Sequence, residues 1–207
     1  GVHRIRATFQ PRRDSVTVEL PADDAPTETF SLDADRGALN AWLSGAIDRP
    51  VSLIKDRDGG FPDHTDAPGP TIVSTATLRR VAEWTGLSVH SIRRRFRANV
   101  EVAGVRPFWE DRLYGPEGTS SRLAIGDTTL AATGPCRRCV VPTRDPDTGD
   151  PTPGFRETFV GHRRASRPAW ASPQDLEEHY RLAVTTTVPE QRRPRVAVGD
   201  PVQPLSE

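Results

Sequence analysis

The chain has 207 residues and a formal net charge of +0, and 35% of its residues are hydrophobic and 6% aromatic. A chain of this length can bury roughly 70% of its unfolded surface and form one domain, or one domain with part of a second. Its balanced charge gives no overall attraction to nucleic acid or an anionic membrane, and no apolar run approaches the roughly 20 residues of a membrane span.

Two paired strands are predicted near the start of the chain. Residues 15–20 and 27–32 alternate polar and apolar side chains, which is typical of strands with one buried face. Pro21 and the aspartates at 23 and 24 lie between them and predict a turn. We therefore expect a hairpin or meander.

A helix and a linker are predicted next. Asp33 or Asp35 can cap a helix that runs to Ile47, and a short buried strand is expected at residues 51–54. Residues 58–70 are rich in Asp, Gly and Pro, which predicts a linker. The expected organisation is a partial β-rich domain at residues 1–57, this linker, and a second domain at residues 71–207.

The second domain is expected to begin with a strand that leads into a helix. Residues 71–74 predict the strand, Thr75 can cap the helix, and Gly86 can end it. Ser88 can cap a second, short helix. Hydroxyl groups at a helix start can also bind an anion, which is the functional alternative to a simple cap at Ser74 and Thr75.

The clearest alternation in the chain lies at residues 95–102. A period of two sends one set of side chains to an apolar face, Phe96, Ala98, Val100 and Val102, and another to a polar face, Arg95, Arg97, Asn99 and Glu101. Such a strand presents Arg97 and Asn99 side by side, either to a ligand or to solvent.

The remaining segments predict short strands and helices. Strands are expected at residues 122–125, 128–132, 182–188 and 195–198, helices near residues 154–162 and 174–180, and a loop at residues 107–118. Many short strands with interspersed helices indicate an α+β fold with a barrel-like sheet and helices packed outside it.

The two cysteines, Cys136 and Cys139, enclose two arginines. Four interpretations are open: a redox dithiol, half of a zinc site, a structural disulfide, or one metal-binding thiolate with a spare cysteine. Pro142 closes an extended run after the pair, which disfavours a thioredoxin-like helix, and the histidines lack zinc-site spacing. Two cysteines cannot form a disulfide framework, so a reducing, cytoplasmic compartment is expected.

Arg137 and Arg138 place fixed positive charge between these thiols. Positive neighbours favour a thiolate and form a seat for phosphate. Nearly all cations of the chain are arginine, with Lys55 the single lysine, and arginine recognises phosphate through several planar donors. A turn is predicted just behind, at residues 145–149. The segment suits a soft metal carried on an anionic cofactor.

Seven motifs stand in one order along the chain: Ile72–Leu78, Arg95–Val100, Trp109–Leu113, Ile125–Asp127, Pro135–Cys139, Asp145–Gly149 and Val198–Val202. Residues 70–203 thereby resemble a MOSC domain (molybdenum cofactor sulfurase C-terminal domain), in particular the branch of the mitochondrial amidoxime-reducing component and its bacterial relatives. The first 55 residues resemble the latter part of the β-rich domain that precedes MOSC in that branch. The chain has no methionine, so we expect the natural gene product to begin earlier.

The resemblance implies that Cys139 is the molybdenum ligand and the catalytic residue. We expect the molybdenum cofactor, a molybdopterin, to be contacted by Arg97, Asn99, Arg137, Arg138, Ser74, Thr75 and Cys136. Where relatives often carry serine after the first cysteine, this chain has Arg137. A soft metal takes a thiolate readily, and arginine and hydroxyl donors suit the phosphate tail.

The branch implies a molybdenum-dependent oxidoreductase that reduces N-hydroxylated small molecules. This chain has no second cysteine cluster for an iron–sulfur centre and no G-x-G-x-x-G after a strand, so electrons are expected from a separate reductase. One alternative is a non-redox cofactor or sulfur-carrier module in which Cys139 holds a persulfide. Another is a plain zinc or structural-cysteine domain. Neither nucleic acid nor a membrane span is expected.

Overall fold

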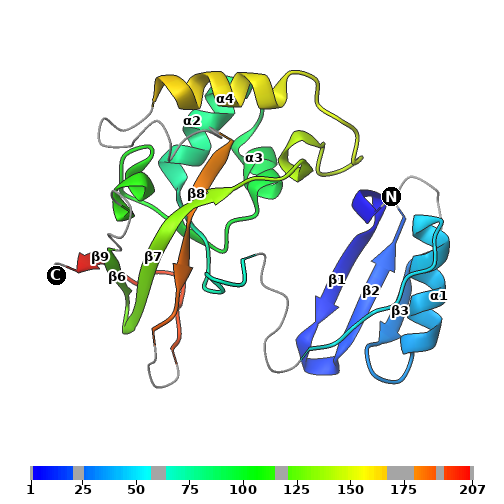
Figure 1. Ribbon diagram of the computed structural model, residues 1–207. Coiled ribbons are helices and arrows are strands. Elements are labelled where there is room, and N and C mark those ends of the chain that lie inside the picture. Colours follow the sequence, from blue (N-terminus) through cyan, green and yellow to red (C-terminus); the bar gives the residue numbers. More distant parts are fainter. Residues whose placement is uncertain are drawn as a thin grey trace. The chain divides into compact units, whose positions relative to one another are not determined.

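The structure is a computed structural model that describes residues 2–20, 26–56, 64–114, 121–166, 180–189 and 194–205. Contacts divide the chain into two compact units: Gly1–Phe61 with Asp145–Pro151, and Pro62–Arg144 with Thr152–Glu207. Each unit combines strands with helices, so the predicted α+β class is confirmed (Figure 1). The expected linker at residues 58–70 lies partly outside the described residues and stays a prediction.

The first unit holds a three-stranded antiparallel sheet in the order β1-β2-β3. Its elements are η1 (Val2–Arg4), β1 (Arg6–Gln10), η2 (Pro11–Arg13), β2 (Ser15–Glu19), β3 (Glu28–Ser31) and α1 (Arg36–Ile47). Val18, Phe30 and Leu39 form its core, one from each of β2, β3 and α1. The two predicted strands and the helix are confirmed. The sequence signal for β1 is weak, because the alternation rests on two apolar residues, Ala7 and Phe9, and the strand is exposed along most of its length.

Residues 51–54 do not form the buried strand that we expected. Their backbone donors are taken by side chains of α1: Val51 N–H donates to Ser44 Oγ (3.0 Å) and Leu53 N–H to Asn40 Oδ1 (2.7 Å). The segment is therefore fastened to the helix, and Ile54 is left 74% exposed.

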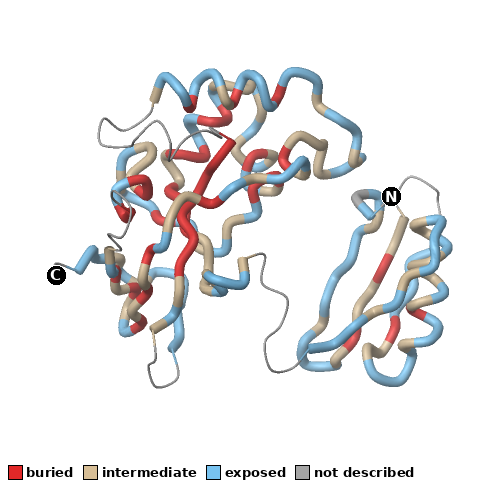
Figure 2. The backbone as a smooth tube through the Cα atoms, in the orientation of Figure 1, coloured by how far each residue is buried: buried red, intermediate tan, exposed pale blue. Residues whose placement is uncertain are grey.

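The second unit is built on a six-stranded sheet in the order β5-β4-β8-β7-β6-β9. Its strands are β4 (Ile72–Ser74), β5 (Val100–Val102), β6 (Arg122–Ile125), β7 (Thr128–Arg137), β8 (Arg181–Thr187) and β9 (Val202–Leu205). β4 and β5 are parallel and the other neighbours antiparallel. The sheet curls into a half-barrel, as the barrel-like prediction requires (Figure 1). β8 is buried along nearly its whole length (Figure 2).

Two apolar clusters fill the two faces of this sheet. The first joins β4 and β8 to the helices α2 (Thr75–Thr85), α3 (Val89–Phe96) and α4 (Phe155–Ala165). The second joins β4 to β6 and β7 with the 3-10 helix η4 (Trp109–Leu113), which lies inside the loop expected at residues 107–118. Ile72 and Val73 belong to different clusters because successive strand side chains point to opposite faces.

The helix boundaries follow the capping residues closely. Ser74, and not Thr75, is the N-cap of α2, and its Oγ accepts a hydrogen bond from Thr77 N–H (3.0 Å). Gly86 ends that helix with a φ of 68°, as predicted. Ser88 caps α3 by accepting from Ser91 N–H (3.1 Å), which confirms the second cap.

The end of the chain closes differently from the prediction. Residues 195–198 form no strand, and the closing strand is β9. Asp200 Oδ2 accepts from Ala197 N–H (2.7 Å), and Gly126 N–H donates to Pro201 O (3.0 Å). A Cβ at Gly126, whose φ is +54°, would lie 2.9 Å from Asp200 Oδ2. The turn at Gly126 therefore packs closely against the segment around Asp200.

The strands predicted at residues 122–125, 128–132 and 182–188 are present as β6, β7 and β8. The helix predicted near residues 154–162 is present as α4. The helix expected near residues 174–180 falls almost entirely outside the described residues. Among the helices that the structure describes, none combines the length and apolar character needed to cross a membrane.

Candidate functional site

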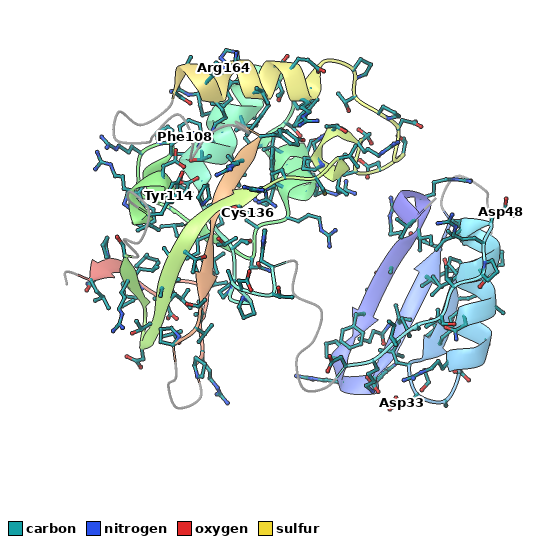
Figure 3. All side chains as sticks on the ribbon, viewed as in Figure 1. Asp33, Asp48, Phe108, Tyr114, Cys136 and Arg164 are labelled. Carbon is teal, nitrogen blue, oxygen red and sulfur yellow. The ribbon has the colours of Figure 1, made fainter. Side chains whose placement is uncertain are left out.

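The ladder between β7 and β8 positions the cysteine segment. Pro135 pairs with Val184 and Arg137 with Arg181, and the register shifts between these pairs. Ala183, inside the shift, has a φ of 71°, so the extra residue of the bulge lies on β8. The bulge lies opposite Cys136, which Figure 3 labels on β7. Bulges of this kind change the direction in which neighbouring side chains point.

The two cysteines have opposite environments. Cys136 is 4% exposed and belongs to the apolar cluster under the helices, with its Sγ 4.0 Å from His64 Nε2. Cys139 follows the strand and is exposed. Neither cysteine forms a disulfide. Of the two sulfur atoms, that of Cys139 is the one a ligand can reach from solvent.

A zinc site built from side chains of this unit gains no support from the geometry. In the part of the chain that the structure describes, which includes His64, His90 and His162, no group of three or more His, Cys, Asp or Glu side chains could hold a metal ion.

The two arginines between the cysteines also differ. Arg137 is the last residue of β7 and is exposed. Arg138 is half-buried: its Nε donates to Leu182 O (3.0 Å), and its guanidinium carbon lies 5.5 Å from the centre of the Phe96 ring. Arg138 therefore braces the segment against β8 and α3. Contact of either arginine with a cofactor stays a prediction.

The prediction of one long strand at residues 95–102 is wrong. α3 extends to Phe96, Arg97 ends it with a φ of 51°, and the strand β5 begins only at Val100. Ile92 and Phe96, four residues apart, lie in the same buried cluster, so helical spacing prevails over the period of two. Phe96 and Val102, expected on one face, lie in different clusters.

Arg97 and Asn99 are consequently not neighbours on a strand face. Arg97 is exposed, and its N–H donates to Arg93 O (2.9 Å) at the helix end. Asn99 Oδ1 accepts from both the N–H and the hydroxyl of Thr71, each at 2.9 Å. The Asn99 amide thus fastens the chain to the start of β4. Their proposed role in cofactor binding remains a prediction.

Arg95 is a supporting residue that the sequence did not reveal. The residue is 3% exposed, and its guanidinium donates to Pro142 O (3.0 Å), Arg144 O (2.7 Å) and Thr152 Oγ1 (3.0 Å). These bonds hold the backbone that follows Cys139, including the 3-10 turn η5 (Val141–Thr143). The one available signal was helical spacing, which would have placed Arg95 on α3.

The hydroxyls at the junction of β4 and α2 have partners inside the protein. Ser74 is fully buried, and its Oγ lies 2.8 Å from Thr77 Oγ1. Phe108 N–H donates to Thr77 Oγ1 at 2.6 Å. The Thr75 hydroxyl bonds to Glu101, whose pKa is lowered chiefly by Arg93 and further by this hydroxyl. An anion site at the junction therefore stays a prediction for Ser74 and Thr75.

Glu110, on η4, is a buried carboxyl beside this junction. It is 1% exposed, and burial raises its pKa to about 7. The hydroxyls of Thr77 and Ser74 act in the opposite direction, and the neighbouring charge of Asp111 adds to the rise. The folded protein therefore favours the protonated form of Glu110 up to near neutral pH.

The raised pKa of Glu110 should be visible in how the stability of the protein changes with pH. In the unfolded chain Glu110 releases its proton near its ordinary pKa of 4.5, but in the fold it does so near 7. Protonated Glu110 therefore contributes fully to the stability of the fold below pH 4.5, and this contribution is lost as the pH rises from 4.5 to about 7. This loss amounts to about 3 kcal/mol. Glu110→Gln, which cannot ionise, should gain that amount relative to wild type between pH 4.5 and 8 in urea unfolding. If the free energies of unfolding of the two proteins differ by the same amount at every pH, the raised pKa of Glu110 is contradicted.

A second buried acid close by is ion-paired. Asp111 Oδ2 lies 3.0 Å from Arg163 Nη1, and Arg163 Nη2 donates to Asp111 Oδ1 (3.1 Å). Both side chains are about 5% exposed or less. Tyr114 Oη also donates to Asp111 Oδ1 (3.2 Å), and the Arg163 guanidinium carbon lies 4.5 Å from the Phe108 ring centre. This pair links η4 to α4 (Figure 3 labels Phe108 and Tyr114).

Comparison with known protein families decides what these elements form. Residues 71–203 match the MOSC domain, and this stretch contains the whole sheet of the second unit up to β9, the helices around it, and Cys139. The chain belongs to the MOSC domain family. MOSC domains are associated with the sulfuration and binding of the molybdenum cofactor, and many belong to enzymes of that cofactor.

Two curated relatives of this MOSC domain carry the same name. The chain is 29% identical over 133 residues to "Molybdenum cofactor sulfurase" of Caenorhabditis elegans, and 32% identical over 133 residues to the protein of that name in Caenorhabditis briggsae. Each alignment covers 62% of this chain and 17% of the relative. The similarity therefore concerns a small part of those longer proteins.

Proposed function

We propose that this chain binds the molybdenum cofactor with Cys139 as the metal ligand, and that it reduces N-hydroxylated compounds. The observation that supports this most is the contrast between the two cysteines. Within the stretch that matches the family, Cys139 presents an exposed thiol while Cys136 is buried in the core. One accessible thiolate is what a metal held by a dithiolene cofactor requires of a protein.

The residues around Cys139 fit such a cofactor in kind. The thiolate is a soft ligand and suits molybdenum. Arg137, exposed at the end of β7, can offer paired donors to a phosphate group. Arg95 fixes the backbone on the C-terminal side of Cys139 through its bonds to Pro142 O and Arg144 O. The segment that carries Cys139 is thus held in place by hydrogen bonds within the protein.

When bound, the metal supplies two-electron redox chemistry. In the proposed reaction the N–O bond of a hydroxylamine or amidoxime breaks, two electrons and two protons are consumed, and an amine or amidine and water are released. A separate reductase supplies the electrons. The roles of this chain are to provide the thiolate, to hold the phosphate with arginine, and to keep the segment after Cys139 in place.

Metal and cofactor analysis tests the proposal. Protein purified from a host that makes molybdopterin should contain about one molybdenum and one pterin per chain. Given a chemical or enzymatic reductant, it should convert benzamidoxime to benzamidine. Stoichiometric zinc without pterin would contradict cofactor binding. Molybdenum and pterin without any reduction would contradict the reductase activity alone.

A second function is favoured by the relatives. Both are named molybdenum cofactor sulfurase, so a sulfur-handling role, in which Cys139 carries a persulfide, is the alternative. An exposed thiol flanked by arginine suits this role as well. Intact-mass and peptide analysis distinguishes the two functions. One extra sulfur atom on the peptide that contains Cys139, in protein free of molybdenum, would support the alternative.

A further inference from the structure

Tyr180 is a buried residue whose polar atom has no evident structural role. It is 3% exposed and immediately precedes β8. Its hydroxyl oxygen is buried and makes no hydrogen bond with any residue that the structure describes. A buried hydroxyl without a partner is costly, and in native proteins such a group often marks a catalytic role or a bound water or ion.

The backbone places Tyr180 beside the cysteine segment. Arg138 N–H donates to Tyr180 O (3.0 Å), which continues the ladder of β7 and β8 to the residue next to Cys139. The ring of Tyr180 packs edge-on against Phe159, with the ring centres 5.4 Å apart. The ring is therefore fixed, and the direction of its hydroxyl is set by the core.

The charged groups that act on Tyr180 are mainly arginines. The Arg156 guanidinium carbon lies 5.2 Å from the centre of the Tyr180 ring. Burial raises the pKa of Tyr180 to about 12. The nearby charges of Arg156, Arg138 and Arg95 lower that pKa, and a charge on Cys139 raises it. The charges that act on the Tyr180 hydroxyl are thus mostly positive, and the hydroxyl stays protonated at neutral pH.

We propose that the Tyr180 hydroxyl donates a hydrogen bond to an anionic atom of the group bound at Cys139, and so is a further ligand-binding residue of the site. The inference rests on the proposed cofactor binding and adds a residue to it. A neutral donor in this position stabilises negative charge on a ligand atom without adding a charge to the core. The ligand, in turn, supplies the partner that the hydroxyl lacks.

Tyr180→Phe removes the hydroxyl and keeps the ring, so it separates the ligand role from a structural one. In cofactor-free protein the melting temperature should be unchanged or about 2–4 °C higher, because an unsatisfied buried group is removed. In loaded protein, the rate at which molybdenum and pterin are lost during gel filtration should rise about 10- to 100-fold, the value of one hydrogen bond to a charged group.

Tyr114→Phe is the matched control. Its hydroxyl is also buried but donates to Asp111 Oδ1, so its removal should lower the melting temperature of the cofactor-free protein and leave cofactor loss at the wild-type rate. A lower melting temperature for cofactor-free Tyr180→Phe would overturn the inference, because the hydroxyl would then have an internal role. Wild-type rates of cofactor loss in Tyr180→Phe would overturn it while the proposed function stands. A wild-type protein without molybdenum would overturn both.

Discussion

Replacing Cys139 by serine should reduce the molybdenum and pterin content of the purified protein from about one per chain to background, without loss of the fold. The side chain is exposed, so the free energy of unfolding should change by no more than about 0.5 kcal/mol. A serine hydroxyl is a hard, weakly acidic group that a soft metal does not take in place of a thiolate. Reduction of N-hydroxylated compounds should disappear with the metal.

The Cys136→Ser substitution should show the reverse pattern. Cys136 is 4% exposed and packs in the apolar cluster, so a hydroxyl there should cost about 1–3 kcal/mol of stability. Molybdenum content in the folded fraction should remain close to wild type. Inductively coupled plasma mass spectrometry and urea unfolding measure the two quantities. Equal loss of metal in both variants would instead favour a mechanism that uses both thiols.

Breaking the buried ion pair between Asp111 and Arg163 should produce the largest loss of stability. Arg163→Met leaves the Asp111 carboxylate buried with its cationic partner removed, and we expect a cost of about 3–5 kcal/mol. The double variant Asp111→Asn with Arg163→Met removes both charges, so it should be more stable than Arg163→Met alone. Urea unfolding at pH 7 measures all three proteins.

Arg93→Met provides the control for this ion pair. Arg93 and Glu101 have the better geometry, with Nε–Oε2 at 2.6 Å, but their side chains are 47% and 27% exposed. Solvent screening limits the contribution of such a pair to about 1 kcal/mol or less. If Arg163→Met and Arg93→Met lower the free energy of unfolding by the same amount, burial does not explain the contribution of the Asp111–Arg163 pair.

Part of the fold could be predicted because its signals are local. Ser88 and Gly86 bound their helices where the sequence indicated, since a cap needs only neighbouring N–H groups or a positive φ. The two strands on either side of Gly126 and Asp127 were also predicted from their own short segments, and the structure pairs them as β6 and β7. The family resemblance over residues 70–203 also came from motifs read directly along the chain, and residues 71–203 match the MOSC domain.

The failure at residues 95–102 has a physical explanation. Alternation and helical spacing both fit this stretch, since Phe96 is two residues from Ala98 and four from Ile92. The contacts of Ile92 and Phe96 with α2 and α4 decide in favour of the helix. Arg95 is thereby turned into the core, where it bonds the backbone near Arg144 across 49 positions. No local pattern contains that information.

The sequence alone determined the family, the end of α2 at Gly86 and the start of α3 at Ser88, because each depends on residues that are neighbours or on motifs in a fixed order. Only the tertiary structure decided which cysteine is accessible, and that the backbone of Tyr180 pairs with that of Arg138 although 42 positions separate them in the sequence. Burial and proximity are products of strand pairing and core packing, which join residues distant along the chain and are not encoded in any short segment of it.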